Sequence, residues 1–449
     1  MNFGNQKVLV VGIGKSGIAA AAALLKRGAR VTVCDRRSID INESGFKSLA
    51  ADGAVLYGGG YPQGDWDLVV VSPGVPLTVE PVTWALANGR PVWGELELAY
   101  RLKAPEVMIA AVTGTNGKTT TTALLGEIFA AQGLPSATAG NIGVPLASVV
   151  EEMSAGWIAC EVSSFQLETT YEFRPRVAGI INITPDHLDR HHTITEYIQA
   201  KARIFSRMQP EDVLVLNYDD EEVRNLAEKA ACQVVFCSRK DRVPGGVYFK
   251  KGVIYSEYQN IGDIIRFDAT RLRGQHNLEN LLVATAMALA VGIEVDVLRS
   301  ALSSFAGVRH RLEEVAVKTG VLYINDSKGT NPDSTIKAIQ SFDQPIILIA
   351  GGRHKGGDLT ALAELIKERV RALVLLGEAR NIIKEKMHSC GYNAIIETET
   401  LEEAVKAASQ ASRAGDVVLL SPACASWDMF ENYEQRGDLF CSLVRKIPD

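Results

Sequence analysis

The repeated alternation of short apolar runs with amphipathic stretches constrains the fold of this chain more than any other feature. Runs rich in Val and Ile occur near residues 7–12, 31–35, 54–57 and 68–72, and stretches with helical periodicity separate them. This pattern is typical of parallel β-strands connected by helices that cover the sheet. The chain has 449 residues, which is more than one compact core normally holds, so we expect several α/β domains.

The strand–helix rhythm restarts twice, which predicts three domains at residues 1–96, 97–306 and 307–449. The second domain should end after a helix at residues 295–304. Short alternating apolar and polar runs at residues 247–267 predict a β-hairpin inserted into this domain.

Composition and charge exclude several functional classes. The net charge of −6 argues against a nucleic-acid-binding surface, because phosphate backbones attract basic proteins. No apolar run approaches the roughly 20 residues that cross a membrane, and the first residues do not resemble a signal peptide. Seven isolated cysteines without a CxxC pair indicate reduced thiols. We therefore expect a cytoplasmic protein without membrane insertion.

A glycine-rich loop, Gly12-Ile13-Gly14-Lys15-Ser16-Gly17, follows the first predicted strand and precedes an alanine-rich helix. Asp35 ends the next strand, and this spacing is typical of dinucleotide-binding folds. Glycines at these positions let a pyrophosphate approach the backbone. The alternative is a tightly packed strand–helix joint without a ligand.

A second loop carries the strongest local signal of the chain. It runs from a strand into a helix and contains Gly114, Thr115, Asn116, Gly117, Lys118, Thr119 and Thr120. Backbone amides in such a loop cradle phosphate groups together with the helix N-terminus. Lys118 should reach the β- and γ-phosphates of a nucleotide, and the Thr119 hydroxyl should bind Mg²⁺. One departure from the strict phosphate-loop pattern is Val112, which occupies the position of its first glycine.

Polar side chains follow two further strands of the central domain. Glu161 ends one apolar run and His187 follows another, so both should lie at the carboxyl edge of the sheet, where α/β proteins bind ligands. A carboxylate at this edge suits a Mg²⁺ ion shared with Thr119. We assign His187 to the same site, whereas His191 and His192 are interpreted as solvated loop residues.

Three residues of predicted helices leave alternatives open. The spacing around Lys201 favours a surface lysine whose stem lies along the helix. Asn277 and Asn280 are three residues apart and share a helix face, where two amides can read the edge of a purine. Helix capping by Asn277 is an equal alternative.

The third domain places cationic or hydroxyl side chains after three of its strands. These candidates are Arg311, Asp326, Ser327, Lys328, Thr330, Asn331, Lys355, Ser421, Ser426 and Trp427. If the three strands are neighbours, their carboxyl ends form one edge. A small acid held at this edge is the simplest interpretation.

The order of the motifs resembles the Mur ligases, which are ATP-dependent amide ligases that build the peptide of bacterial cell-wall precursors. The similar motifs are GTNGKTT, GNIG, EVSSFQLE, DHLDRH, GxHNxxN, NDSKGTN and SPACASWDMF, between about residues 8 and 446. The resemblance implies a Rossmann-like first domain, a central P-loop ATPase domain with a largely parallel sheet, and a Rossmann-like α/β third domain. NDSK and SPACASxDxF are most similar to members that join D-glutamate to UDP-N-acetylmuramoyl-L-alanine through an acyl phosphate. We expect these two substrates and a monomer.

The resemblance also implies roles for the matching residues. UDP-sugar binding is implied for Gly14, Lys15, Ser16, Asp35, Arg36, Arg37, Ser72, Pro73, Gly74, Asn141, Ser163 and His187. ATP binding is implied for the loop from Gly114 to Thr120 and for Asn280, Arg311 and Asp326. D-glutamate binding is implied for Lys328, Thr330, Lys355, Ser426, Trp427 and Tyr433. Two Mg²⁺ ions are implied, with ligands among Thr119, Glu161, His187 and a carbamate formed on Lys201.

Catalytic roles follow by the same resemblance for Lys118, Glu161, His187, Lys201, Arg311 and Lys328. Two positions depart from the family pattern: His354 replaces an expected acidic residue, and Trp427 is bulkier than the usual apolar residue. The alternatives are another Mur ligase or a folylpolyglutamate synthase, a nucleotide-gated binding protein, and a dehydrogenase that uses the first glycine loop.

Overall fold

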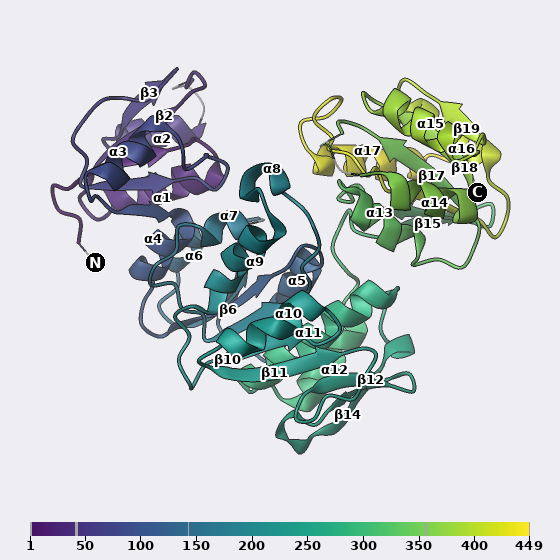
Figure 1. Ribbon diagram of the computed structural model, residues 1–449, viewed down its shortest axis with the longest axis horizontal. Helices are drawn as coiled ribbons and strands as arrows, with labels where there is room; N and C mark the ends of the chain where they lie inside the picture. Colours follow the sequence, from purple (N-terminus) through teal and green to yellow (C-terminus); the bar gives the residue numbers. More distant parts are fainter. Residues whose placement is uncertain (1, 41–43, 142, 355, 357, 449) are drawn as a thin grey trace. The chain divides into compact units, whose positions relative to one another are not determined.

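The computed structural model describes residues 2–40, 44–141, 143–354, 356 and 358–448, and it confirms an α/β fold built on three sheets (Figure 1). The chain divides into two compact units. Unit 1 contains residues 1–270 and 279–304, and unit 2 contains residues 271–278 and 305–449. Within the described residues, no helix is long and apolar enough to span a membrane.

The first sheet of unit 1 has five parallel strands in the order β3-β2-β1-β4-β5. The strands are β1 (Lys7–Val11), β2 (Arg30–Asp35), β3 (Val55–Gly58), β4 (Leu68–Val71) and β5 (Val92–Gly94), and the helices are α1 (Lys15–Leu25), α2 (Ser44–Ala51) and α3 (Glu80–Ala87). The four strands predicted here from the apolar runs are therefore confirmed. The strand order reverses at β1, which pairs with both β2 and β4, and this reversal opens a crevice at the carboxyl ends of the strands.

The second sheet of unit 1 has nine strands in the order β14-β13-β12-β11-β10-β9-β6-β8-β7. The strands are β6 (Val107–Thr113), β7 (Ser136–Gly140), β8 (Gly156–Glu161), β9 (Val177–Ile180), β10 (Val213–Asn217), β11 (Gln233–Ser238), β12 (Val247–Lys250), β13 (Val253–Ser256) and β14 (Gly262–Arg266). Pairing is parallel from β7 to β12 and antiparallel from β12 to β14. The predicted hairpin is thus confirmed, with a third antiparallel strand.

Nine α-helices accompany this sheet among the described residues: α4 (Glu95–Leu102), α5 (Lys118–Ala131), α6 (Leu146–Val150), α7 (Ser164–Leu167), α8 (Leu188–His191), α9 (Ile194–Ala202), α10 (Glu221–Asn225), α11 (Gln275–Val291) and α12 (Val295–Ser304). The helix predicted at residues 295–304 is confirmed. The first turn of α11 belongs to unit 2 and the rest to unit 1, so this helix runs through the connection between the units.

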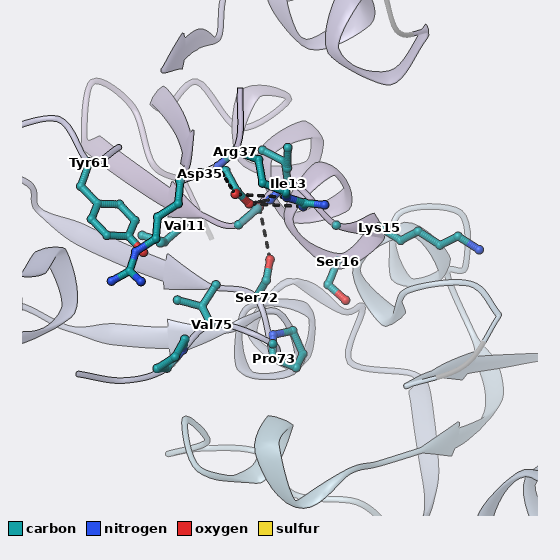
Figure 2. Close-up of a pocket in the computed structure, with 15 residues that line it drawn as sticks. Val11, Ile13, Lys15, Ser16, Asp35, Arg37, Tyr61, Ser72, Pro73 and Val75 are labelled. Atoms are coloured by element: carbon teal, nitrogen blue, oxygen red, sulfur yellow. Dashed lines mark hydrogen bonds and ion pairs between the residues drawn. The ribbon is translucent and has the colours of Figure 1, made fainter. Parts of the chain in front are cut away.

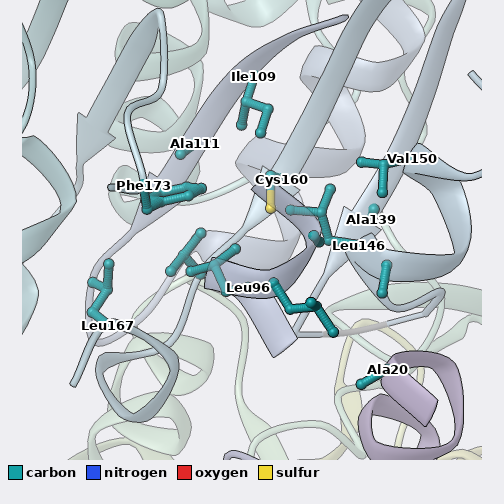
Figure 3. Close-up of a cluster of buried hydrophobic side chains, with 14 of the residues drawn as sticks. Ala20, Leu96, Ile109, Ala111, Ala139, Leu146, Val150, Cys160, Leu167 and Phe173 are labelled. Carbon is teal, nitrogen blue, oxygen red and sulfur yellow. The ribbon is translucent and has the colours of Figure 1, made fainter. Parts of the chain in front are cut away.

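One apolar core joins the two sheets of unit 1. It contains Ala20 and Leu24 of α1, Leu96 of α4 and Leu146 of α6, all less than 1% exposed, together with side chains of the central sheet (Figure 3). Burying a leucine side chain contributes about 1.5–3 kcal/mol of transfer free energy. The first domain is therefore packed on the central domain as part of one body.

The sheet of unit 2 has six strands in the order β15-β16-β20-β17-β18-β19. The strands are β15 (Glu313–Lys318), β16 (Val321–Asn325), β17 (Ile346–Gly351), β18 (Val370–Leu376), β19 (Ile395–Glu397) and β20 (Val417–Leu420); the helices are α13 (Pro332–Ile339), α14 (Thr360–Arg369), α15 (Arg380–Ser389), α16 (Leu401–Ala411) and α17 (Tyr433–Arg445). Only β15 is antiparallel to its neighbour. Because β16, β20 and β17 are adjacent, the three polar strand ends expected from the sequence lie along one edge.

Candidate active site

A pocket of about 420 Å³ lies at the strand reversal of the first sheet (Figure 2). Its wall includes all nine residues of the first domain for which the resemblance implies UDP-sugar binding: Gly14, Lys15, Ser16, Asp35, Arg36, Arg37, Ser72, Pro73 and Gly74. Tyr61 also lines the pocket, and its ring lies 5.5 Å from the Arg36 guanidinium carbon. Sequence reasoning missed Tyr61 because the residue lies in an irregular segment without a recognisable motif.

Asp35 braces the glycine loop of this pocket. Its Oδ1 accepts a hydrogen bond from Arg37 N (2.8 Å), and its Oδ2 accepts one from Ile13 N (3.1 Å). Burial alone would raise the pKa of Asp35, but these hydrogen bonds and the Arg37 charge lower it. The carboxylate is therefore charged at neutral pH and fixes the loop that follows β1.

The glycines of this loop differ in the space around them. A Cβ atom at Gly17 would lie 1.9 Å from Gly12 O, so the close strand–helix joint requires glycine there. A Cβ atom at Gly14 would meet nothing within 4 Å, because Gly14 faces the open pocket. The packing interpretation therefore holds for Gly17, whereas the approach of a pyrophosphate to Gly14 stays a prediction.

The second glycine loop connects β6 to α5 in unit 1. Gly117 has a φ of 87°, and a Cβ atom there would lie 2.1 Å from Asn280 Oδ1. Lys118 Nζ donates hydrogen bonds to Gly114 O and Thr115 O, both at 2.8 Å. The lysine thus lies over the loop whose backbone would cradle a phosphate. Asn280, on α11, is brought to this loop as expected.

Asn277 is the third residue of α11, so it lies inside the helix and is not the N-cap residue that precedes it. Its Nδ2 donates a hydrogen bond to Arg273 O (2.7 Å). Asn277 and Asn280 fall in different compact units. The N-cap alternative is therefore wrong for Asn277.

Glu161 and Lys201 are both buried beside the phosphate loop. Glu161, the last residue of β8, accepts a hydrogen bond at Oε1 from Asn141 Nδ2 (3.0 Å), whereas its buried Oε2 has no hydrogen-bond partner among the described residues. Lys201, on α9, is 1% exposed and donates from Nζ to Gly114 O (2.8 Å). The interpretation of Lys201 as a surface lysine is wrong, because α9 packs this face inward.

Burial sets the protonation of Lys201. Removal from water lowers its pKa well below the ordinary value, the Lys118 charge lowers it further, and Asp186 and Glu161 oppose the shift. Burial of an amine favours its neutral form, because the charged form loses its hydration.

His187 stands at the start of α8 in a left-handed conformation, with φ 54° and a side chain that is 41% exposed. Its ring centroid lies 4.9 Å from that of Phe165 in an edge-to-face contact. His191 is only 5% exposed: its Nε2 lies 2.9 Å from Ser164 Oγ and its Nδ1 lies 3.3 Å from Glu168 Oε1. The prediction that His191 is solvated is wrong, because the single turn of α8 directs its side chain inward. The same prediction is confirmed for His192, which is exposed.

The donors near the phosphate loop fit Mg²⁺ better than a metal held by protein ligands alone. In the part of the chain that the structure describes, no three His, Cys, Asp or Glu side chains form a metal site. Mg²⁺ commonly takes one or two carboxylates and completes its shell with phosphate oxygens and water. Glu161 Oε2, for which the described residues supply no hydrogen-bond partner, is a carboxylate oxygen of the type that Mg²⁺ takes.

Ser163 has a structural role that the sequence did not indicate. Its Oγ accepts a hydrogen bond from Gln166 N (3.3 Å), and Gln166 Oε1 accepts one from Ser163 N (3.0 Å), which together cap α7. The predicted contact of Ser163 with a sugar would have to share this hydroxyl.

In unit 2, Asp326 follows β16 and is buried. Its Oδ2 accepts a hydrogen bond from Ser421 Oγ (2.7 Å), and its Oδ1 accepts one from Leu312 N (3.3 Å). Burial raises the pKa of Asp326 to about 6, although the Arg311 charge lowers it. Arg311 Nε is buried and has no hydrogen-bond partner among the described residues. Such a pair suits a nucleotide ligand that satisfies the guanidinium.

The next turn carries Lys328, whose Nζ lies 5.4 Å from the centroid of the Tyr433 ring. Arg436 fixes this turn by donating to Ser327 Oγ (2.9 Å) and Ser327 O (2.7 Å). Sequence reasoning missed Arg436, which lies inside α17 and is separated by 109 residues from its partner.

Of the other predicted D-glutamate residues, Thr330 is partly buried beside Lys328, Ser426 is buried, and Trp427 is 62% exposed. Ser421 is buried and donates a hydrogen bond to Asp326, and Ser327 accepts one from Arg436, so both hydroxyl groups already have protein partners. Lys355 lies outside the described residues.

Three family models match the chain in the order of its sheets. They are the Mur ligase MurD-like N-terminal domain at residues 6–94, the Mur ligase middle domain at 112–288, and the Mur ligase glutamate ligase domain at 310–424. A protein of Pelotomaculum thermopropionicum named UDP-N-acetylmuramoylalanine–D-glutamate ligase is 49% identical, with 99% of each chain covered. The chain belongs to the Mur ligase family. A second such relative, from Clostridioides difficile, is 46% identical and is matched over the full length of both chains.

Solved structures share the Mur ligase fold at low identity. The UDP-N-acetylmuramate-alanine ligase of Thermotoga maritima has a TM-score of 0.61 at 19% identity, with 98% of this chain and 99% of that chain covered. MurF ligase from the same organism has a TM-score of 0.61 at 16% identity, with 99% of this chain and 96% of that chain covered. These structures confirm the three-domain α/β architecture expected from the sequence.

Proposed function

We propose that the protein joins D-glutamate to UDP-N-acetylmuramoyl-L-alanine in an ATP-dependent step of peptidoglycan precursor synthesis. The observation that carries the proposal is the shared acceptor Gly114 O. Lys118 and the buried Lys201 both donate to it, so a second lysine, whose pKa burial lowers, lies at the phosphate loop. Placement of a buried amine there supports chemistry at the nucleotide rather than a simple nucleotide switch.

The reaction needs ATP because a carboxylate has no adequate leaving group. The terminal carboxylate oxygen of the alanyl group takes the γ-phosphoryl group, and ADP leaves. The amine of D-glutamate then attacks the acyl carbon and loses a proton, the C–O bond breaks, and inorganic phosphate leaves. Charge on the transferred phosphoryl group must be neutralised, which is the role of Lys118 and Arg311 in this proposal.

The UDP-sugar occupies the 420 Å³ pocket in this proposal. Gly14, Lys15 and Ser16 hold the diphosphate at the start of α1, where helical amides favour an anion. Arg36 and Arg37, on the loop that Asp35 braces, contact the uridine end, and Ser72, Pro73 and Gly74 form the opposite wall. Asn141, Ser163 and His187 extend the contacts toward the sugar and its alanyl group.

ATP binds the loop from Gly114 to Thr120, with Asn280, Arg311 and Asp326 as further contacts. Mg²⁺, when bound, offsets charge on the phosphoryl oxygens. Thr119, Glu161 and His187 are the residues of this chain that would hold it, and we propose two ions.

Lys201 has the chemistry needed for carbamylation. The neutral amine adds to CO₂ and forms a carbamate with release of one proton, so an unprotonated, buried lysine is the required reactant. Burial and the neighbouring Lys118 lower the pKa of Lys201 and supply this form. The carbamate would be an anion beside Glu161 and would serve as a ligand of the second Mg²⁺.

Unit 2 binds D-glutamate through Lys328, Thr330, Lys355, Ser426, Trp427 and Tyr433 in this proposal. We also propose domain limits at residues 1–96, 97–306 and 307–449, because each sheet falls within one of these ranges. The use of ATP agrees with the cytoplasmic location expected from the sequence.

ADP release from the purified protein tests the function. With UDP-N-acetylmuramoyl-L-alanine, Mg²⁺ and ATP present, D-glutamate should increase ADP release far more than L-glutamate, L-alanine or L-lysine. A preference for another amino acid would reassign the substrate. Slow ADP release that no amine accelerates would favour a nucleotide-gated protein.

A further inference from the structure

A group of side chains connects the wall of the N-terminal pocket to the segment that carries His187. Arg190, in α8, donates from Nη1 to Pro73 O (2.9 Å), and Pro73 lines the pocket. The same guanidinium donates from Nε (3.2 Å) and Nη2 (2.6 Å) to Glu168 Oε2. Its Cζ lies 4.4 Å from the centroid of the Phe165 ring. The guanidinium therefore has Glu168 and Pro73 as hydrogen-bond partners in its plane and the Phe165 ring against its face.

His191 extends this arrangement. Its ring contacts Glu168 Oε1 (3.3 Å) and Ser164 Oγ (2.9 Å) and stacks on Phe165 with centroids 5.4 Å apart. We name Ser164, Phe165, Glu168, Arg190 and His191 the bridge cluster. Phe165 also contacts His187, so the cluster holds both ends of α8 against α7.

The bridge cluster reaches a ligand site at each end. On one side, the His191 ring lies 5.2 Å from the Tyr197 ring, whose hydroxyl lies 3.2 Å from Thr115 Oγ1 in the phosphate loop. On the other side, Ser72, next to Pro73, donates from Oγ to Gly12 O (3.3 Å) in the first glycine loop (Figure 2). A continuous series of contacts thus runs from one glycine loop of unit 1 to the other.

Partial burial of the Arg190–Glu168 ion pair carries a desolvation cost. The Arg190 and Glu168 side chains are 19% and 18% exposed, so both charges are largely removed from water. Buried ion pairs are weak contributors to stability and are retained in some proteins because they fix one geometry. Planar, multidentate contacts make arginine suited to such a role, which lysine cannot reproduce fully.

A second ion pair in unit 1 offers a comparison. Arg27, after α1, pairs with Glu151, after α6, and so also joins the first domain to the central domain. Neither residue is among the described residues that line the N-terminal pocket. The Arg27–Glu151 pair therefore tests whether any ion pair between these layers is sufficient.

We infer that Arg190 is a positioning residue for phosphoryl transfer. It fixes the position of the pocket turn at residues 72–74 relative to the His187 segment and the phosphate loop. The inference rests on the proposed function, in which the carboxylate arrives from the pocket and the phosphoryl group from the loop. Reacting atoms must approach within about 3–3.5 Å, and a misplacement of about 1 Å can lower the rate about 100-fold. Arg190 acts through the pocket wall and not on the reacting atoms.

The test compares R190A, R190K and the control R27A in the full-length protein. UDP and a non-hydrolysable ATP analogue are titrated separately, and kcat is measured from ADP release with all three substrates. We expect R190A to lower kcat about 10- to 100-fold while each dissociation constant changes less than about 3-fold. R190K, which keeps the charge but lacks the planar guanidinium, should recover part of kcat, and R27A should match the wild type.

Other outcomes overturn the inference in distinguishable ways. An R190A or R190K protein with wild-type kcat, or an equal loss in R27A, refutes the role of Arg190 while leaving the ligase function intact. A loss of UDP affinity with wild-type kcat at saturating substrate assigns Arg190 to binding alone. If the wild-type protein itself forms no ADP with these substrates, the proposed function fails and the inference fails with it.

Discussion

Replacement of Lys201 by methionine gives the sharpest test of the buried lysine. Lys201 is 1% exposed, and burial lowers the pKa of its amine well below the ordinary value of about 10.4 that it has in the unfolded chain, because a charged amine is destabilised at the buried position. Methionine has a similar length and carries no such cost. We therefore expect Lys201→Met to leave the free energy of unfolding unchanged or raise it by about 1–4 kcal/mol at pH 7, as for other buried charges replaced by apolar groups.

The loss of one hydrogen bond does not reverse this expectation. Lys201 Nζ donates to Gly114 O, but the same oxygen also accepts from Lys118 Nζ, so the carbonyl remains paired in the variant. A net hydrogen bond contributes about 1 kcal/mol, and an unsatisfied partner would add a further cost that is absent here.

The direction in which the free energy of unfolding changes with pH tests the same reasoning. Because burial lowers the pKa of Lys201, the unfolded state binds more protons than the folded state between the folded-state pKa and about 10.4. The stability of the wild type should therefore rise with pH in this window, by at most about 1.4 kcal/mol per pH unit. Lys201→Met lacks this gain, so its advantage at pH 7 should shrink by up to about 2.7 kcal/mol at pH 9.

Urea unfolding in buffers free of CO₂, ATP and Mg²⁺ at pH 7 and pH 9 measures both quantities. Four of the five tryptophans lie in unit 1, so fluorescence follows the unit that contains Lys201. The exposed Lys26→Met is the control and should change stability by less than about 0.5 kcal/mol. Added bicarbonate should then stabilise the wild type and not Lys201→Met.

A Lys201→Met protein that is more than about 1 kcal/mol less stable at pH 7, with a pH profile parallel to that of the wild type, would refute the reasoning. That result would mean that Lys201 is charged and stabilising in the folded state. A protonated amine cannot add to CO₂, so the proposed carbamate would lose its chemical basis.

Three further substitutions test the remaining assignments. Lys118→Ala should abolish ADP release and leave UDP affinity within about 3-fold, measured by calorimetry; retained turnover contradicts the phosphate-loop role. Glu161→Gln keeps an oxygen for Asn141 but removes the carboxylate charge, so half-maximal activity should need at least about 10-fold more Mg²⁺, and an unchanged Mg²⁺ titration argues against a metal ligand. Lys328→Ala should raise the KM for D-glutamate by about 10-fold or more and that for the UDP-sugar much less; the reverse ranking would reassign unit 2.

The sequence predicted features that depend on short-range patterns. Val-rich runs identified β1 and β4, and the glycine loops that follow β1 and β6 have the expected strand–loop–helix setting. Glu161 was placed at a strand end because the apolar run before it has a clear limit. The antiparallel strand β15 was not anticipated, since its alternating charged residues carry no strong apolar signal.

Burial of individual polar residues was harder to predict, because it depends on contacts that are distant in sequence. Lys201 is buried by packing against the loop at Gly114, 87 residues away. His191 is directed inward by a helix of four residues, which is too short to show a periodic pattern. Arg190 meets Pro73 across 117 residues, and nothing in the local sequence of either residue indicates the contact.

The apolar core that runs from α1 through α4 and α6 has a consequence for dissecting the protein. A fragment that begins at residue 97 would lack Leu96, which belongs to the same apolar core as Leu146 and Val150. The side chains of Leu146 and Val150, now buried, would then face water. Such a fragment should aggregate or fail to accumulate. Exchange of the first domain for that of another protein would therefore require the apolar surfaces of α1, α4 and α6 to be redesigned together.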